Sequence, residues 1–252
     1  MQEIILYIKT LNLIIDIGNN SAKLFLFNGE QIILHTRIKE DYMEQLIAWS
    51  NTYDIKRAIV STVIDIDKAQ RSAMESLGFP VLWFSNETPM PIGVKYRTPH
   101  TLGCDRLAAA VGAACKAPGR NIIVIDAGSA ITTDIVDKDG NFCGGNIAPG
   151  VEMRLKALHE YTGRLPLIDK DGELPSYGCD TETAIRCGVI KGVCYEIDGF
   201  INEFREKNGE VFVFLTGGDE KTLTDKIKNR IFADKFLVAK GLNRILTNYE
   251  HK

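Results

Sequence analysis

Residues 13–19 read LIIDIGN and residues 123–129 read IVIDAGS, so the chain carries one short pattern twice. Each copy is an aliphatic run that ends in Asp-x-Gly and a small polar residue. A second strand-like segment follows each copy, at residues 23–27 and 134–136, and then a Gly-containing turn. Apolar runs of this length bounded by Gly, Asn and Asp predict β-hairpins. The repeat therefore predicts two halves of similar design.

The rest of the chain alternates between helical and strand patterns, which predicts an α/β fold. Pro118-Gly119 ends an Ala-rich helix and is the expected boundary between domains 1–119 and 120–252. In addition to the hairpins, we expect strands at residues 57–63, 81–84 and 211–215 and helices at 68–77, 106–116, 151–161 and 242–249. Residues 181–205 predict one or two helices, and residues 236–238 are an apolar run.

Composition excludes several classes of protein. The chain has 252 residues, of which 45% are hydrophobic and 25% charged, as in an ordinary globular protein. A net charge of −3 gives no basic field for nucleic acid, so we expect no nucleic-acid partner. No apolar stretch approaches the length of a membrane span, so we expect no membrane contact. The six Cys form no CxxC pair, which favours reduced thiols and a cytoplasmic location.

The two Asp-x-Gly turns are candidate phosphate-binding sites. Such a turn can direct backbone N–H groups at phosphate oxygens while its carboxylate holds a cation. The alternative is that Asp and Gly merely form the turns. A third turn, Thr216-Gly-Gly-Asp219, follows a predicted buried strand, and three turns together favour a nucleotide site. The chain has neither GxxxxGK[ST] nor GxGxxG, so those nucleotide-binding folds are excluded.

The three turns together resemble those of the acetate and sugar kinase, heat-shock cognate protein and actin superfamily. In that superfamily two hairpins hold the β and γ phosphates, and a Gly-Gly turn lines the adenosine pocket. The resemblance implies a duplicated actin-like, ribonuclease H-like, two-domain kinase fold, in which the matched hairpins face each other across the nucleotide.

Several motifs in order along the chain narrow the resemblance to one family. They are DIGNNSAK at 16–23, VKY at 94–96, LGCDR at 102–106, DAGSAIT at 126–132, GGNIAPG at 144–150 and DTETAIR at 180–186. This ordered set resembles the signatures of type III pantothenate kinase. The resemblance implies ATP-dependent phosphorylation of pantothenate to 4′-phosphopantothenate, the first step of coenzyme A synthesis, by a homodimer.

The resemblance also implies how ATP is held. Asp16 would bind Mg2+ through its water shell, Lys23 would place a charge near the phosphates, and Asp126 would bind a monovalent cation, K+ or NH4+. The residues implied to bind ATP or its phosphates are Asp16, Gly18, Asn19, Lys23, Gly128, Ser129, Gly217 and Gly218. Family members commonly have Thr at positions 20 and 129, where this chain has Asn20 and Ser129.

Pantothenate would be bound by residues from three motifs: Tyr96, Gly103, Cys104, Asp105, Arg106 and Thr181. Asp105 corresponds to the family's catalytic base, which accepts the proton of the substrate hydroxyl. The simpler interpretation is that Asp105 is a helix N-cap, since it precedes an Ala-rich segment. Tyr96 and Thr181 also have simpler, structural interpretations. Tyr96 would be an aromatic residue at the end of a strand, and Thr181 would be a helix N-cap.

Two other functions remain open from the sequence. One is a non-catalytic relative that acts in transcriptional control, and the presence of Asp16, Lys23, Asp105, Arg106 and Asp126 argues against it. The other is a superfamily kinase for a different small hydroxylated substrate, which the residues assigned to pantothenate oppose. Residues 1–11 precede the usual start of the family's first strand.

Overall fold

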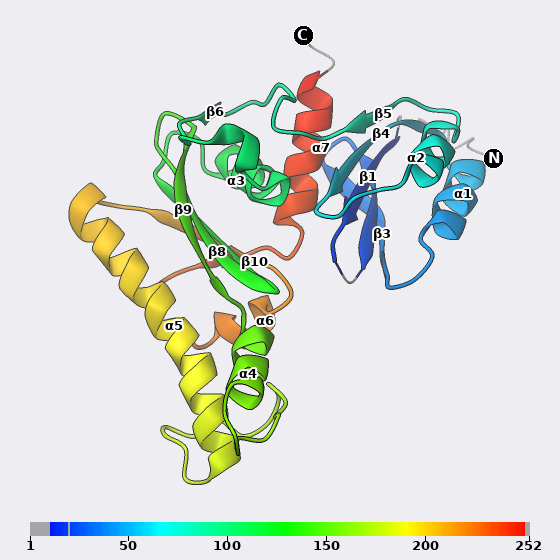
Figure 1. Ribbon diagram of the computed structural model, residues 1–252. Coiled ribbons are helices and arrows are strands. Elements are labelled where there is room, and N and C mark those ends of the chain that lie inside the picture. Colours follow the sequence, from blue (N-terminus) through cyan, green and yellow to red (C-terminus); the bar gives the residue numbers. More distant parts are fainter. Residues whose placement is uncertain (1–10, 20, 250–252) are drawn as a thin grey trace, which may run out of the picture. The chain divides into compact units, whose positions relative to one another are not determined.

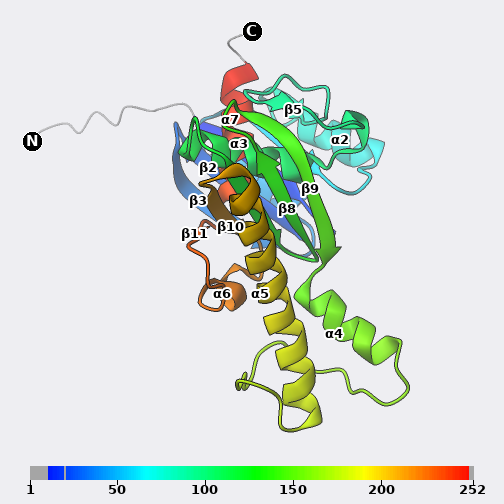
Figure 2. The ribbon, with the colours of Figure 1, turned by 90° about the vertical axis from the view of Figure 1, so that its left-hand side faces the viewer.

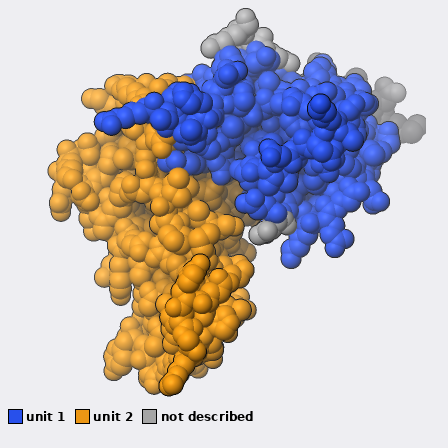
Figure 3. Space-filling view, in the orientation of Figure 1, with its two compact units in different colours: residues 1–91, 97–112, 238–252 blue, residues 92–96, 113–237 orange. Residues whose placement is uncertain are grey.

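The computed structural model describes residues 11–19 and 21–249 and divides into two compact units (Figures 1 and 3). Unit 1 consists of residues 1–91, 97–112 and 238–252, and unit 2 consists of residues 92–96 and 113–237. Asn20 and residues 1–10, which precede the usual start of the family's first strand, lie outside the described residues. The boundary expected between domains 1–119 and 120–252 concerns the two halves of the sequence, and it stays a prediction.

Unit 1 is built on a five-stranded sheet with the order β3-β2-β1-β4-β5. The hairpin strands β1, β2 and β3 are antiparallel, whereas β1, β4 and β5 are parallel. The strands are β1 (Leu11–Ile17), β2 (Ala22–Asn28), β3 (Gln31–Ile38), β4 (Ile55–Thr62) and β5 (Val81–Trp83). The helices are α1 (Met43–Thr52), α2 (Lys68–Glu75), the 3-10 turn η1 (Pro99–Thr101), α3 (Cys104–Lys116) and α7 (Leu237–Tyr249). The end of α3 from residue 113 and the first residue of α7 are counted in unit 2.

Alternate residues of β1 decide which helices cover one face of this sheet. Leu13, Ile15 and Ile17 are buried in one cluster with Leu46 and Trp49 of α1, and Met74 of α2 belongs to the same cluster. Successive side chains of a strand point to opposite faces, so this cluster occupies one face only. The helices α1 and α2 therefore cover that face.

The C-terminal helix α7 returns to unit 1 and is tied to both α3 and the sheet. A Cβ on Gly241 would lie 1.8 Å from the carbonyl oxygen of Ala108, so only glycine allows this approach of α7 to α3. Asn243 accepts a hydrogen bond from Asn12 of β1 at 2.7 Å and donates one to the Gly29 carbonyl at 2.8 Å. The helix thus holds α3 and the first hairpin in one unit.

Unit 2 is built on a six-stranded sheet with the order β11-β10-β7-β8-β9-β6. The strands are β6 (Gly93–Val94), β7 (Ile122–Ala127), β8 (Ala130–Val136), β9 (Asn141–Pro149), β10 (Phe212–Thr216) and β11 (Phe232–Ala233). The helices are α4 (Val151–Glu160), α5 (Thr181–Asn208) and α6 (Glu220–Thr224). Buried residues of β7, β8 and β10 share one cluster with α4 and α5, so α5 covers a face of this sheet (Figure 2).

The two sheets share the same five-strand topology, to which unit 2 adds β6. The order β9-β8-β7-β10-β11 repeats β3-β2-β1-β4-β5 strand for strand, which confirms the duplicated fold. The hairpin turns differ by one residue. The pair Ile17–Ala22 closes the first turn over residues 18–21, whereas Ala127–Ile131 closes the second over residues 128–130. Asp16 is therefore paired with Lys23, but Asp126 is paired with Thr132.

Most expected elements are present, with shifts of a few residues at their ends. Two expectations about helices are refined: residues 181–205 belong to one helix, α5, and the apolar run at 236–238 joins the closing helix, α7. Leu237 is buried at the start of the helix, and Leu242, Ile245 and Leu246 are buried at the i, i+3, i+4 spacing of one helical face. The sequence analysis did not anticipate β3, β9 or α1.

Candidate active site

In unit 1 the first hairpin places a carboxylate opposite an ammonium group. Asp16 and Lys23 are direct partners across β1 and β2, so their side chains share a face of the sheet. The Lys23 Nζ lies 3.4 Å from Asp16 Oδ2, and the Asp16 side chain is only 16% exposed. The Gly18 N–H donates to the Ser21 carbonyl at 3.0 Å and closes the turn, in which Asn19 is exposed.

Asp105 is the second residue of α3, so the N-cap interpretation in its strict form is wrong. Its Oδ1 accepts a hydrogen bond from the backbone N–H of Arg106 at 2.8 Å. A Cβ on Gly103 would lie 2.5 Å from the same oxygen, so a larger residue there would displace the carboxylate. Gly103 and the helix N-terminus together orient Asp105.

The carboxylates of Asp16 and Asp105 interact with each other within unit 1. Burial raises the pKa of Asp16, Lys23 opposes this shift, and repulsion from Asp105 adds to it. Two carboxylates in such an environment favour a bound cation, because a cation offsets both burial and repulsion. Asp16, Lys23 and Asp105, all singled out in the sequence, are therefore brought together in unit 1.

Two further residues near Asp16 were not identified from the sequence. Ser61 is the partner of Asp16 on the parallel strand β4, and its buried Oγ has no hydrogen-bond partner among the described residues. Arg37 lies on β3 opposite Lys23, and its Nε donates to Ser21 Oγ at 2.9 Å. A strand hydroxyl and a strand arginine have no distinctive local pattern, so only the sheet register reveals them.

The neighbours of Asp105 anchor the start of α3. Arg106 is buried, with 6% of its surface exposed. The half-buried Cys104 thiol contacts the Phe84 carbonyl at 3.8 Å and Asn86 Oδ1 at 3.6 Å. Burial, together with the charge of Asp105, raises the pKa of Cys104, so the thiol is not a nucleophile at neutral pH.

In unit 2 the second hairpin carries Asp126 at the end of β7. The parallel partner of Asp126 is Thr216, the last residue of β10, so Asp126 and the Gly217-Gly218 turn lie at the same edge of the sheet. The Gly128 N–H donates to the Ala130 carbonyl at 3.0 Å and closes the hairpin turn, which leaves Ser129 exposed. These predicted phosphate residues are thus brought together within unit 2.

The Gly-Gly turn is built tightly against β7. Gly217 has φ +102, and a Cβ there would lie 2.3 Å from the Ala127 carbonyl oxygen, so glycine is required for both reasons. Lys170 places its Nζ 2.6 Å from Asp219 Oδ1 and 3.1 Å from Glu152 Oε1. Burial acts to lower the pKa of Lys170, but these two carboxylates outweigh it and raise the pKa. Lys170 is a charged neighbour of the turn that the sequence analysis missed.

Two predicted substrate residues lie on separate elements of unit 2. Tyr96 follows β6 and packs edge-on against Phe142 of β9, with ring centroids 6.0 Å apart. Thr181 is the exposed first residue of α5. The N-cap of α5 is Asp180, which forms a capping box with Thr183, so the N-cap interpretation of Thr181 is wrong.

The residues near Asp16 fit a magnesium ion that is coordinated mainly by water and substrate phosphates. Within residues 11–19 and 21–249, no group of three or more His, Cys, Asp or Glu side chains forms a metal site. Mg2+ usually keeps several waters and binds one or two carboxylates plus substrate phosphates. The Asp16 and Asp105 carboxylates and the unsatisfied Ser61 hydroxyl are suited to a hydrated cation.

The duplicated topology, with a carboxylate-bearing hairpin in each unit, places the chain in the class of actin-like folds. A protein from Campylobacter jejuni assigned to the Baf family of transcriptional activators has this fold, with a TM-score of 0.63, 23% identity, and coverage of 95% of this chain and 100% of that one. The activator of 2-hydroxyisocaproyl-CoA dehydratase from Clostridium difficile, with bound ADPNP, has a TM-score of 0.53, 12% identity, and coverage of 96% of both chains.

The sequence defines the family. Residues 12–203 match the type III pantothenate kinase family. A type III pantothenate kinase from Bacteroides fragilis is 51% identical over 241 residues, which cover 96% of this chain and 99% of that protein. The chain belongs to the type III pantothenate kinase family, as its motifs had indicated.

We predict that Asp16→Asn makes the chain without nucleotide more stable at neutral pH. Because the pKa of Asp16 is raised on folding, the folded state is favoured at low pH, and that advantage is lost as the pH rises through the raised pKa. Asn is always neutral, so its Tm should exceed that of the wild type at pH 7.5, and the difference should shrink toward pH 4. Kinase activity should fall by roughly 10²-fold or more, as expected when electrostatic stabilisation is removed. A lower Tm for Asp16→Asn at pH 7.5 would contradict the assigned environment.

We predict that Asp105→Asn lowers turnover by roughly 10²- to 10⁴-fold, because an amide cannot accept the substrate proton. ATP binding should survive, since Asp16, Lys23 and Asp126 are unchanged. The measurements are steady-state turnover and ATP titration. The matched control is Asp67→Asn, because Asp67 caps α2 by accepting the Gln70 N–H at 2.7 Å. That variant should keep wild-type turnover. A folded Asp105→Asn protein with near-wild-type turnover would restrict Asp105 to a helix-terminal role.

Proposed function

We propose that this chain transfers the γ-phosphoryl group of ATP to pantothenate, yielding 4′-phosphopantothenate and ADP, the first step of coenzyme A synthesis. Family membership supports the reaction and both substrates. The observation that carries the proposal in this chain is that unit 1 holds the buried Asp16 paired with Lys23 at 3.4 Å and places the Asp105 carboxylate near enough to raise the pKa of Asp16. It gives a candidate base and a candidate cation ligand in one unit.

In the proposed mechanism the substrate hydroxyl attacks the γ-phosphorus while Asp105 accepts the hydroxyl proton, and ADP leaves. Such transfers proceed through a loose transition state, so the protein acts through positioning and charge. Cys104 anchors the start of α3 through its contacts with Phe84 and Asn86. Arg106, Tyr96 and Thr181 are proposed to contact pantothenate.

Lys23 is proposed to neutralise phosphate charge. The exposed turn residues Asn19 and Ser129 are proposed to donate hydrogen bonds to the phosphates, on turns closed by the Gly18 and Gly128 N–H groups. Asp16 would hold Mg2+ through its water shell, and the ion would supply positive charge to the ATP oxygens.

The test is ADP release from ATP and Mg2+ in K+ buffer, with and without pantothenate. We expect ADP release that depends on pantothenate and one equivalent of phosphopantothenate per ADP. Release that depends on another hydroxylated acceptor would favour the broader sugar-kinase interpretation. No acceptor-dependent release would favour a non-catalytic relative.

We predict that activity depends on K+ or NH4+ through Asp126. A carboxylate beside phosphates needs a cation to offset like-charge repulsion. The wild type should be slower in Na+ than in K+. The Asp126→Ala variant should have the same rate in both salts, on the order of 10²-fold below the wild-type rate in K+. The control is Asp139→Ala, an exposed Asp at the other end of the same hairpin. Equal wild-type rates in Na+ and K+ would exclude a specific monovalent cation at Asp126.

We propose a homodimer that uses an exposed apolar face of unit 2. Ile147 of β9, Met153 of α4 and Tyr195 of α5 are 67%, 47% and 61% exposed. Arg154 joins the three elements beside these residues, because it bonds to the Pro149 carbonyl at 2.8 Å and to both Glu196 carboxylate oxygens at 2.7 Å. Large exposed apolar side chains on a rigid face are typical of subunit interfaces.

We predict that Tyr195→Glu converts the dimer to a monomer, because it places a charge on this apolar face. Light scattering after size exclusion should give twice the 28.0 kDa chain mass for the wild type and one chain mass for the variant. Tyr249→Glu on α7 is the control, since Tyr249 is 46% exposed but lies in unit 1. A wild-type monomer, or a dimeric Tyr195→Glu, would exclude this interface.

We propose a cytoplasmic location. All six cysteines are free thiols, which fits a reducing compartment. None of the helices among residues 11–19 and 21–249 combines the length and apolarity that a bilayer crossing needs.

A further inference from the structure

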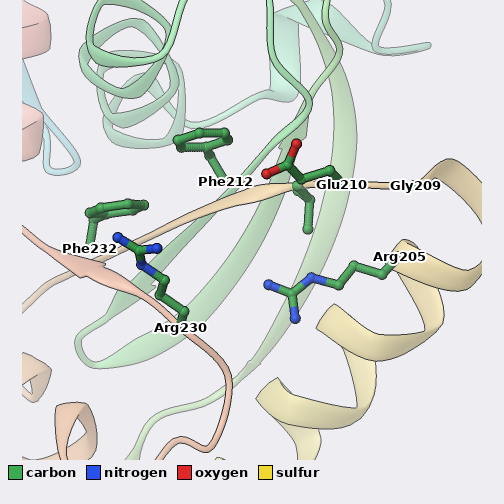
Figure 4. Close-up of a pocket in the computed structure, with 7 residues that line it drawn as sticks. Arg205, Gly209, Glu210, Phe212, Arg230 and Phe232 are labelled. Atoms are coloured by element: carbon green, nitrogen blue, oxygen red, sulfur yellow. The ribbon is translucent and has the colours of Figure 1, made fainter.

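Unit 2 contains a pocket of about 400 Å³ (Figure 4). It is lined by Arg205, Glu210, Val211, Phe212, Arg230 and Phe232, together with Gly209. Phe212 begins β10, whereas Thr216 ends it and leads into the Gly217-Gly218 turn. The pocket is therefore at the other end of this strand, roughly 13 Å away along its axis. Its volume falls in the range of about 300–1,000 Å³ that is usual for small-molecule sites.

The aromatic rings of the pocket pack against arginine guanidinium groups. Phe212 and Phe232 stack with centroids 5.8 Å apart and an interplanar angle of 7°. The Arg230 guanidinium lies over the Phe232 ring at 5.4 Å, and that of Arg120, outside the pocket, lies over Phe212 at 5.5 Å. A guanidinium that lies over a ring still has N–H groups at its edge, available to an anion.

The second arginine is directed into the pocket by α5 and by the loop before β11. Arg205 extends from the last turn of α5 toward that loop, where it donates to Asn229 Oδ1 (Figure 4). Asp198 of α5 holds the loop by accepting the backbone N–H of Asn229 at 2.9 Å and its side-chain amide at 2.8 Å. Arg205 and Arg230 are thus presented by an anchored loop and helix end.

The charges of the pocket do not balance. Glu210 has a nearby cation, the Arg120 guanidinium at 3.8 Å. Arg205 and Arg230 form no ion pair with an acidic side chain among the residues that the structure describes. Two guanidinium charges are therefore left for a ligand, which suits a dianion better than a monocarboxylate.

We propose that this pocket binds a small organic phosphate, separate from the site where ATP and pantothenate react. A phosphomonoester carries close to two negative charges at neutral pH, and arginine binds its oxygens through paired N–H groups. Phe212, Phe232 and Val211 provide an apolar wall for the organic part. Because none of these residues belongs to the proposed phosphotransfer machinery, the site is independent of the proposed reaction.

The test is calorimetric titration of the full chain with phenyl phosphate, with Mg2+ and ADP saturating so that the nucleotide site is filled. The wild type should bind one equivalent per chain. The double variant Arg205→Gln/Arg230→Gln should bind at least tenfold more weakly, with kinase activity unchanged. Lys228→Gln, an exposed cation of the same loop, should bind like the wild type. No binding by the wild type, or equal affinity in the double variant, would overturn the proposal.

A second measurement needs no variant. Phenylglyoxal modifies accessible arginines, and mass spectrometry of the wild type locates the modified residues. With Mg2+ and ADP present, phenyl phosphate should slow modification of Arg205 and Arg230 at least tenfold, while Arg244, exposed on α7, should react at an unchanged rate. Unchanged modification of Arg205 and Arg230 would overturn the proposal even if the double variant did not fold.

Discussion

The close approach of α7 to α3 is the constraint on which unit 1 depends. It exists because Gly241 has no side chain where the Ala108 carbonyl lies, and because Asn243 reaches the sheet through Asn12. These contacts connect the chain end to the first strand, 231 positions earlier. They hold the helix that carries Asp105 in the same unit as the strand that carries Asp16. The candidate base and the candidate cation ligand therefore depend on a helix that itself carries none of the predicted site residues.

The duplicated topology serves different chemistry in the two units. In unit 1 the longer hairpin turn pairs Asp16 with Lys23, so the carboxylate has a cationic neighbour and a nearby Asp105. In unit 2 the shorter turn pairs Asp126 with Thr132, a neutral residue. A one-residue difference in a hairpin changes which side chain stands opposite the carboxylate. The same fold can therefore be suited to a hydrated divalent ion in one unit and, as we propose, to a monovalent ion in the other.

Sequence reasoning was accurate where the determinants are local. The hairpin strands, the α/β alternation and the ordered motifs were readable, because apolar runs and Gly-Asp turns act over a few neighbouring residues. It was less accurate where a segment has mixed character. The strand β9 contains Gly144 and Gly145, and β3 is a half-exposed outer strand, so neither has the apolar run of a buried strand. Thr181 precedes a helix in the sequence, but only the hydrogen bonds identify Asp180 as its cap.

The sequence by itself determined the duplication, the fold class, the family and the residue types proposed for catalysis. Each of these is encoded in short motifs whose order along the chain carries the information. The tertiary structure alone decided that α7 completes unit 1, that the Ser61 hydroxyl lies beside Asp16, and that Arg205 and Arg230 share a pocket. These arrangements join segments that are distant or unpatterned in the sequence. They follow from sheet register and close helix packing, which are set by the whole folded chain rather than by any local periodicity.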